Sequence, residues 1–402
     1  MSELTPMTTM KLSERIRQIG PSATLAASAR AAELRAEGID VLDLGPGQPD
    51  FDTPAHIREA GVRAIREGRT RYTAVAGIPE LREAVADLYS LREGVVYRPE
   101  ETMVTAGGKQ GLFNIFAALL DPGDEVIIPT PYWVSFPEQV KLAGGVPVYV
   151  DTDEADGFAL RAETILDACT ERTKVVILNT PSNPSGAVIG PSDMEDLAQL
   201  AIERGFYLLV DECYASLVYD GADHVTPLTA GAEAQDVTIF CGSCSKSYAM
   251  TGWRVGYIAG PAPLIKACSS LQGHSTSNAS SVSQYAALEA LTGDQTPVRQ
   301  MLTTFAERRD VVVPRIREIP GMTCVDPRGA FYAFPNVSEL LGEEMATSAD
   351  LAGWLIDECH VVTVPGTAFG RDGHLRLSYA TSMTVLEEAL DRIANACEKL
   401  TS

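Results

Sequence analysis

The chain has 402 residues, of which 45% are apolar and 21% charged, and its formal net charge is −22 at pH 7. This composition is typical of a globular protein, and the length predicts two domains rather than one ordinary core. So negative a surface repels nucleic acid and anionic membranes, so we expect neither as a partner. A local cluster of arginine and lysine can still bind a small anion.

The cysteine pattern and the N-terminus suggest a cytoplasmic location. Residues 1–10 show no basic segment followed by an apolar run, and no run of about eighteen apolar residues occurs, so we expect neither a secretory signal nor a spanning helix. The eight cysteines are scattered, mostly inside apolar runs, as is typical of reduced thiols. Cys241 and Cys244 form a CxxC pair, but no second pair or paired histidines accompany it, which disfavours zinc or redox chemistry.

The N-terminal part of the chain predicts two helices, at 25–37 and 56–67, with a short strand at 41–44 between them. The strand is followed by residues 45–51, where glycines and prolines cluster and predict a tight, exposed turn. A second loop with glycine and proline, at 71–82, leads into a helix that ends near residue 92.

Strands and helices alternate through the middle of the chain. The expected strands are 102–106, 125–128, 146–150, 174–178 and 206–210. Each pair is separated by a helical pattern, and this spacing predicts a mostly parallel sheet with helices on both faces.

Lys246 lies between two apolar β-like runs, at 236–240 and 254–259. We expect it on a short loop between two strands, with serines beside it and Arg254 eight positions further on. A lysine presented into a cleft beside a cation has a lowered pKa, which makes its amine nucleophilic. Serine hydroxyls and a guanidinium are good partners for a phosphate. A solvated surface lysine is the ordinary alternative, and this setting disfavours it.

After residue 260 the pattern changes to long helices and then to short strands. The expected strands are 321–325, 330–334, 361–364 and 374–378. This change predicts a second, smaller α+β domain. We place the large domain at 53–298 and the small domain at 299–402, with the N-terminal segment 1–52 belonging to the small domain.

Several polar groups follow the predicted parallel strands, and ligands of open α/β sheets bind beyond the carboxyl ends of the strands. These groups are Gly107 and Gly108 at a helix N-terminus, Asn183, Asp211, Tyr214, Ser243 and Lys246. An anion site, an amide, a carboxylate, a phenol and a lysine together fit a phosphorylated aromatic aldehyde cofactor. Each group alone has an ordinary structural explanation, such as a turn or a salt bridge, and their joint placement disfavours it.

The segment Ser243–Gly256 resembles the lysine segment of the class I aminotransferases, which bind pyridoxal 5'-phosphate (PLP). The resemblance extends from about Ser13 to Lys399 and is strongest for subgroup Iβ, the bacterial and plant aspartate aminotransferases. Its other matching stretches are 21–24, 47–51, 72–82, 107–110, 131–135, 179–186, 211–214 and 374–378. It implies the α/β architecture of PLP-dependent transferase fold type I, with a mostly parallel central sheet in a large domain and a smaller α+β domain.

The resemblance also implies the cofactor contacts. Lys246 would bind the PLP aldehyde covalently and, once freed, would move the substrate proton. Asp211 would pair with the ring nitrogen, Tyr214 and Asn183 would hydrogen-bond the phenolic oxygen, and Trp133 would stack on the ring. The phosphate would be held by Gly107, Gly108, Lys109, Ser243, Ser245 and Arg254. Tyr72 would reach the phosphate of a neighbouring subunit, which implies a homodimer with shared active sites.

The implied substrate contacts fall into two groups. Arg376 would bind the α-carboxylate, assisted by Gly47, Asn183 and Trp133. The residues resembling the set that receives a distal carboxylate are Lys109, Ser22 and Thr24. A cation in the first turn opposes the helix dipole, so the position of Lys109 favours a functional role over a merely solvated one. Gln48 and Thr367 depart from the subgroup pattern near the substrate side.

The implied reaction is a ping-pong transfer of the amino group of L-aspartate to 2-oxoglutarate. Prephenate aminotransferase activity stays open, because the pattern of Thr24 and Lys109 also occurs in that branch of the subgroup. A second alternative is another PLP-dependent outcome, such as oxidation, cyclisation or elimination. A third is a regulatory module with an aminotransferase fold; such modules usually carry a DNA-binding domain or lack the lysine, and the negative charge disfavours DNA.

Overall fold

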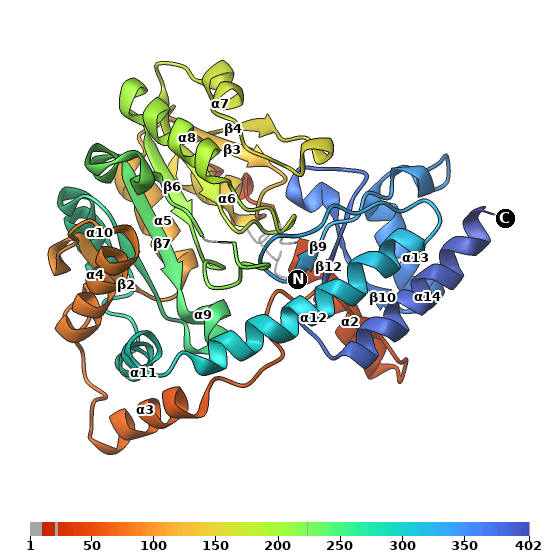
Figure 1. Cartoon of the computed structure of the whole chain (residues 1–402), viewed down its shortest axis with the longest axis horizontal. Coiled ribbons are helices and arrows are strands. Elements are labelled where there is room, and N and C mark those ends of the chain that lie inside the picture. Colours follow the sequence, from red (N-terminus) through yellow and green to blue (C-terminus); the bar gives the residue numbers. More distant parts are fainter. Residues whose placement is uncertain (1–9, 21–22, 223, 402) are drawn as a thin grey trace, which may run out of the picture.

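The computed structural model describes residues 10–20, 23–222 and 224–401. Its largest element is a seven-stranded sheet, seen on the left of Figure 1. The strands, in spatial order, are β2 (Thr102–Thr105), β8 (Gly256–Ala259), β7 (Thr238–Ser243), β6 (Tyr207–Asp211), β5 (Thr173–Asn179), β3 (Glu125–Thr130) and β4 (Val146–Asp151). β8 is antiparallel to both of its neighbours, and the other pairs are parallel. The predicted mostly parallel sheet is confirmed.

The central strands are continuous apolar runs, which suits strands covered by helices on both faces. In β5, Val175 and Ile177 belong to the apolar cluster on one face of the sheet, whereas Val176 and Leu178 belong to the cluster on the other. The first cluster packs against α5 (Gly108–Leu119), α6 (Ser135–Ala143) and α10 (Ala262–Ser275). The second packs against α4 (Pro79–Glu93), α7 (Ala162–Ala168), α8 (Pro191–Arg204) and α11 (Ser281–Thr292). α3 (Ala55–Arg66) lies against α11. We call this assembly the sheet unit.

A second assembly, which we call the small unit, lies on the right of Figure 1. Its antiparallel sheet has the order β11 (Val364–Pro365), β12 (Leu375–Ser378) and β9 (Tyr332–Ala333). The N-terminal strand β1 (Leu42–Asp43) pairs in parallel with β10 (Val361–Val362). Its helices are α2 (Ala23–Ala36), α13 (Ser348–Cys359) and α14 (Met383–Thr401), and the long helix α12 (Thr296–Glu318) runs between the two units.

The remaining elements are short. They are α1 (Glu14–Arg17), α9 (Cys244–Ser247) and the 3₁₀ helices Pro99–Glu101, Glu154–Asp156, Pro227–Ala230, Ala232–Asp236, Thr251–Trp253, Ser338–Leu340 and Gly366–Phe369. Within the described residues, no helix is both long and apolar enough to cross a membrane.

Three predicted elements differ in the structure. The strand expected at 321–325 is reduced to one bridge between Thr323 and Asn336, and a proline at position 327 soon follows. The strand expected at 361–364 is divided between β10 and β11, which pair with different partners. Lys246 lies on the short helix α9 rather than on a loop, because the Ser243 hydroxyl accepts from the N–H of Ser245 and caps that helix.

A buried charge cluster fixes the carboxyl end of β6. Glu212, directly after this strand, accepts from the Tyr89 hydroxyl at 2.6 Å and from Arg92 at 2.8 Å, both on α4. His224 lies 3.3 Å from the same carboxylate. Burial raises the pKa of Glu212, but Arg92 and His224 outweigh it and bring the pKa to about 2. Glu212 is therefore ionised and ties β6 to α4.

Removing the arginine should leave this carboxylate buried with too few partners. We expect Arg92→Leu to lower the free energy of unfolding by about 3 kcal/mol. Arg392 provides a matched control, because the side chains of Arg92 and Arg392 are both 25% exposed. Their acidic partners differ: the side chain of Glu212, which pairs with Arg92, is 2% exposed, whereas that of Asp40, which pairs with Arg392, is 77% exposed. Arg392→Leu should cost about 1 kcal/mol or less. Urea unfolding measures both, and equal losses would contradict the role of Glu212.

Candidate active site

A cavity of about 280 Å³ lies at the carboxyl ends of β5 and β6, between the sheet unit and the small unit. Both units contribute to its wall. The sheet unit supplies Lys109, Trp133, Val134, Asn179, Asn183, Asp211, Cys213, Tyr214 and Lys246, and the remaining lining residues are Gly47, Tyr332 and Arg376. The structure therefore brings half of the site residues predicted from the sequence into one cavity.

Lys246 projects from α9 and donates a hydrogen bond to the backbone oxygen of Gly47. Burial lowers the pKa of Lys246 to about 8, and Arg376 and Arg254 act in the same direction against Cys213 and Asp211. A sizeable fraction of this amine is neutral slightly above neutral pH. It therefore has the protonation state required of a nucleophile or a general base.

Asp211 ends β6 and is 4% exposed. Burial raises its pKa to about 6, although the N–H of Cys213 donates to its Oδ1 at 3.2 Å. A buried carboxylate of this kind is stabilised by a cation that carries a proton, such as a protonated ring nitrogen. This property fits the predicted partner of the PLP ring.

An anion site surrounds the start of α5. Gly107 caps this helix with φ 82°, and a Cβ there would lie 2.6 Å from Nη2 of Arg254. The hydroxyls of Ser243 and Ser245 are 2.8 Å apart. Backbone N–H groups at a helix N-terminus, two hydroxyls and a guanidinium are the donors that a phosphate needs. The donor set therefore fits a phosphorylated cofactor.

Arg376 is buried on β12 with neutral hydrogen-bond partners. Its Nη1 donates to Oδ1 of Asn183 at 2.9 Å and its Nη2 to the backbone oxygen of Gly45. Its Nε has no partner among the described residues. A guanidinium removed from water without a carboxylate is costly, and an anionic ligand would offset that cost. The ordinary alternative for Arg376 is a salt bridge between the domains, and Arg376 forms no salt bridge with any of the described residues.

Lys109 lies in the first turn of α5, and its ammonium is 4.8 Å from the centroid of the Trp133 ring. Its side chain is exposed at the mouth of the cavity, whereas Arg376 is buried. The cavity thus carries two cations in different settings. Such a pair can bind the two carboxylates of one dicarboxylic acid.

Three of the predicted site residues are not placed at this cavity by the described chain. Ser22 and the side chain of Thr24 lie outside the described residues. Tyr72 is 90% exposed and does not line the cavity of its own chain. Its role toward a neighbouring subunit therefore stays a prediction.

Sequence reasoning missed Tyr332 and Cys213, which both line the cavity. Tyr332 lies in a predicted apolar strand, where an aromatic residue is normally part of the core. Cys213 stands between Asp211 and Tyr214 in the sequence, and its position between two predicted site residues could have indicated that it lines the cavity. Cys241 and Cys244 are buried free thiols, and no group of three metal-ligating side chains occurs in the described part of the chain.

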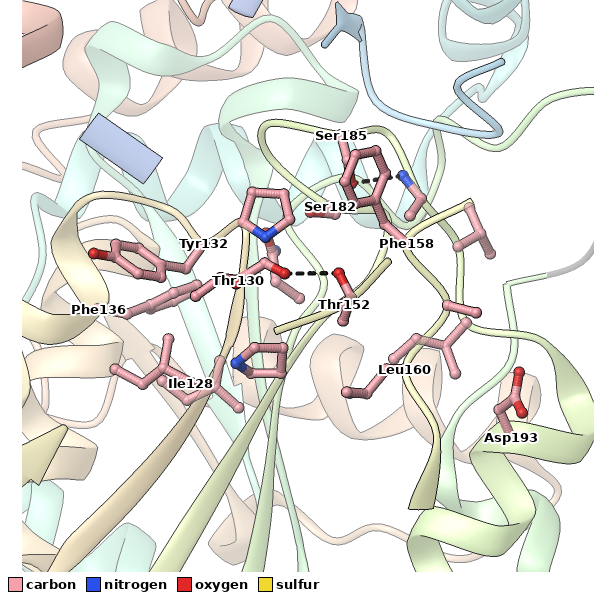
Figure 2. Close-up of a pocket in the computed structure, with 18 residues that line it drawn as sticks. Ile128, Thr130, Tyr132, Phe136, Thr152, Phe158, Leu160, Ser182, Ser185 and Asp193 are labelled. Carbon is pink, nitrogen blue, oxygen red and sulfur yellow. Dashed lines mark hydrogen bonds between the residues drawn. The ribbon is translucent and has the colours of Figure 1, made fainter. Parts of the chain in front are cut away.

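A second cavity, of about 60 Å³, lies beside Asn179 (Figure 2). Ile128, Phe136, Phe158 and Leu160 form much of its wall. Its charged lining residue, Asp193, is paired with Arg161. None of the predicted catalytic or binding groups lines it, so the chemistry belongs to the larger cavity.

Comparison with known proteins identifies a matching family model and similar relatives. The chain matches the family model "Aminotransferase class I and II" over residues 39–393. It is 46% identical over 385 residues to the aspartate aminotransferase of Geobacillus stearothermophilus, covering 96% of this chain and 98% of that protein. It is 45% identical over 391 residues to the probable aspartate/prephenate aminotransferase of Aquifex aeolicus (strain VF5), covering 97% and 99%.

The fold agrees with solved structures as well. The aspartate aminotransferase from Thermus thermophilus, determined with maleate, superimposes with a TM-score of 0.92 at 44% identity. The match covers 96% of this chain and 100% of that one. The α/β fold predicted from the sequence, that of PLP-dependent transferase fold type I, is confirmed.

The raised pKa of Asp211 predicts a cost to stability in the protein without cofactor. The folded chain binds this proton more tightly than the unfolded chain, so stability falls as the pH rises from about 4 to 6. Asp211→Asn removes the cost. The cofactor-free variant should be more stable than the wild type by about 2 to 3 kcal/mol at pH 7.5, and by about 1 kcal/mol at pH 4.5.

Urea unfolding at both pH values measures this difference. Asp220, whose pKa is lowered by its hydrogen bonds with Arg309, is the control of opposite sign. Asp220→Asn should not stabilise the protein at pH 7.5. A gain for Asp211→Asn that is the same at both pH values would show that the carboxyl group is not the cause.

Proposed function

The chain belongs to the class I and II aminotransferases, and from this we propose that it transfers the amino group of L-aspartate to 2-oxoglutarate, using PLP in a ping-pong cycle. One observation carries the proposal. Two cations, Arg376 and Lys109, line the same cavity as Lys246, and neither has an acidic partner among the residues that the structure describes. Aspartate and 2-oxoglutarate each carry two carboxylates, so both substrates can be bound by this pair.

The residues around the cavity would hold PLP at its phosphate, ring nitrogen, phenolic oxygen and ring face. The start of α5, Ser243, Ser245 and Arg254 would bind the phosphate. Asp211 would pair with the ring nitrogen, and its burial beside that nitrogen would keep the nitrogen protonated. Tyr214 and Asn183 would donate to the phenolic oxygen, and Trp133 would cover the ring face. When bound, PLP supplies a ring that accepts the electrons of the bond broken at the substrate α-carbon.

The chain's own groups would then direct the proton. Arg376 would bind the α-carboxylate with its two forked nitrogens and so fix the orientation of the α-carbon. The amine of Lys246 would take the proton from that carbon and return it at the next step. Its pKa of about 8 suits both directions near neutral pH, because the neutral and charged forms are both available. Closure of the small unit and the N-terminal segment over the substrate would exclude water.

We also propose a homodimer with shared active sites in the cytoplasm. A tyrosine that is 90% exposed on a surface loop suits a contact with a second copy of the chain, as expected for Tyr72. Seven cysteines are free thiols, which suits a reducing compartment: Cys169, Cys213, Cys241, Cys244, Cys268, Cys324 and Cys359.

Prephenate aminotransferase activity is the second candidate. Relatives with the two kinds of name match at almost the same identity, 46% and 45%. Lys109 is exposed at the cavity mouth and therefore can meet carboxylates on substrates of different shape. The aspartate and prephenate aminotransferase activities would use the same contacts around Lys246. They would differ in the part of the substrate that meets Lys109 at the cavity mouth.

Half-reactions test the choice directly. With PLP bound, aspartate and glutamate should each abolish the visible absorption rapidly, and 2-oxoglutarate should restore it. Arginine and phenylalanine should act far more slowly, because neither offers a second carboxylate. Faster restoration by prephenate than by 2-oxoglutarate would favour the second candidate. Oxygen uptake or a persistent new band with another amino acid would indicate a different PLP-dependent reaction.

The role of Lys109 predicts a selective loss. Lys109→Ala should reduce kcat/KM for aspartate by about tenfold to a hundredfold, because a charge-assisted hydrogen bond is lost. Alanine, which has no distal carboxylate, should be affected much less. The control is Lys141→Ala, since Lys141 is paired with Glu138 on α6 and does not line the cavity. Equal losses for aspartate and alanine would remove Lys109 from distal-carboxylate binding.

A further inference from the structure

Tyr332 contacts two residues that line the cavity, Tyr214 and Arg376. It is 1% exposed on β9, and its hydroxyl lies 2.7 Å from the hydroxyl of Tyr214. The face of its ring lies 4.5 Å from the guanidinium carbon of Arg376. A Cβ on Gly47 would lie 2.6 Å from its hydroxyl, so this position leaves room for a glycine and little else.

The two phenols can form an ordered chain of hydrogen bonds. A phenol has one proton to donate, so Tyr214 can donate to a ligand while bonded to Tyr332 only if it accepts from Tyr332. A hydroxyl that accepts a hydrogen bond is polarised and becomes a stronger donor. Tyr332 would therefore strengthen whatever hydrogen bond Tyr214 makes in the cavity.

Arg376 acts on the first member of this chain. Burial raises the pKa of Tyr332, and the guanidinium against its ring opposes that rise. A cation near a phenol makes its O–H a better donor. A carboxylate bound by Arg376 would neutralise the positive charge of the guanidinium and so make the Tyr332 hydroxyl a weaker donor.

We propose that Tyr332 is a positioning residue that couples carboxylate binding at Arg376 to the hydrogen bond that Tyr214 donates to the cofactor. The coupling rests on the proposed function, in which Tyr214 donates to the phenolic oxygen of PLP. When Tyr214 is a strong donor, its hydrogen bond stabilises the deprotonated form of the phenolic oxygen. An empty Arg376 therefore favours the deprotonated cofactor, and a bound carboxylate favours the protonated one.

The predicted observable is the pH midpoint at which the visible absorption of the PLP-bound enzyme changes. The titratable and charged groups facing Tyr332 are Tyr214, Cys213 and Arg376. Those facing Lys246 are Cys213, Arg376, Arg254 and Asp211. Arg376 also bonds Asn183, which offers a second route to the cofactor. Tyr332→Phe leaves that route and the ring in place, so it isolates the hydroxyl.

The experiment compares PLP-bound wild type, Tyr332→Phe and Tyr379→Phe, each titrated with and without maleate. Tyr379 is the matched control, because its hydroxyl bonds that of Tyr219 at 3.2 Å within the same apolar cluster and away from the cavity. In Tyr332→Phe the midpoint without maleate should rise by about half a pH unit or more. Its further rise on adding maleate should be clearly smaller than that of the wild type. Tyr379→Phe should match the wild type in both respects.

A second comparison separates the chain of phenols from general loosening. In a Tyr214→Phe background, Tyr332→Phe should cause no additional shift, because the acceptor is already absent. If Tyr332→Phe shifts the midpoint in this background as much as it does alone, the proposal is overturned. It is also overturned if the Tyr332→Phe enzyme has the same midpoint and the same response to maleate as the wild type. Either outcome contradicts only the role of Tyr332. The proposed function still holds if the wild-type enzyme transfers amino groups from aspartate. A wild type that binds no PLP would overturn both.

Discussion

A buried arginine with neutral partners is the constraint on which this active site depends. Arg376 comes from β12 of the small unit, yet its nitrogens bond Asn183 of the sheet unit and the backbone of Gly45. The rings of Tyr332 and Phe369 lie against its guanidinium, at 4.5 and 5.1 Å. The side chain is thereby fixed in place before any ligand arrives. Because this charge has no carboxylate partner among the described residues, the α-carboxylate contact proposed above would supply one, at the boundary between the two units.

Two adjacent carboxyl groups show how the sheet assigns different roles to similar residues. Asp211 and Glu212 follow each other at the end of β6, so their side chains point to opposite sides of the sheet. Glu212 meets Arg92 and has its pKa lowered to about 2, whereas burial raises the pKa of Asp211 to about 6. The ionised Glu212 anchors the strand, and Asp211 would be available for the cationic ring nitrogen proposed above. A structural acid and an acid with a proposed functional role are thus neighbours in the sequence.

Much of this arrangement is predictable from the sequence because its signals are local. The apolar strands of the sheet are continuous runs, and the groups directly after them, Asp211 and Lys246 among them, must gather at one edge. The contact of Tyr214 with Tyr332 joins residues 118 positions apart, and no local pattern distinguishes such a tyrosine from one in the core. The strands of the small unit are less predictable from the sequence for the same reason. Its strands are two to four residues long and are defined by tertiary pairing, so the expected strand at 321–325 was wrong.

The different settings of the two cations have a consequence for specificity. Arg376 is fixed by aromatic rings and two hydrogen bonds, so in the proposed role it would select strictly for a carboxylate next to the reacting carbon. Lys109 lies at an exposed mouth against the face of Trp133, and its flexible stem lets the ammonium follow the ligand. With the roles proposed above, such a site would discriminate sharply at the α-carbon and loosely at the distal end. Acceptance of more than one dicarboxylic acid would then follow from the position of Lys109, without any change around Lys246.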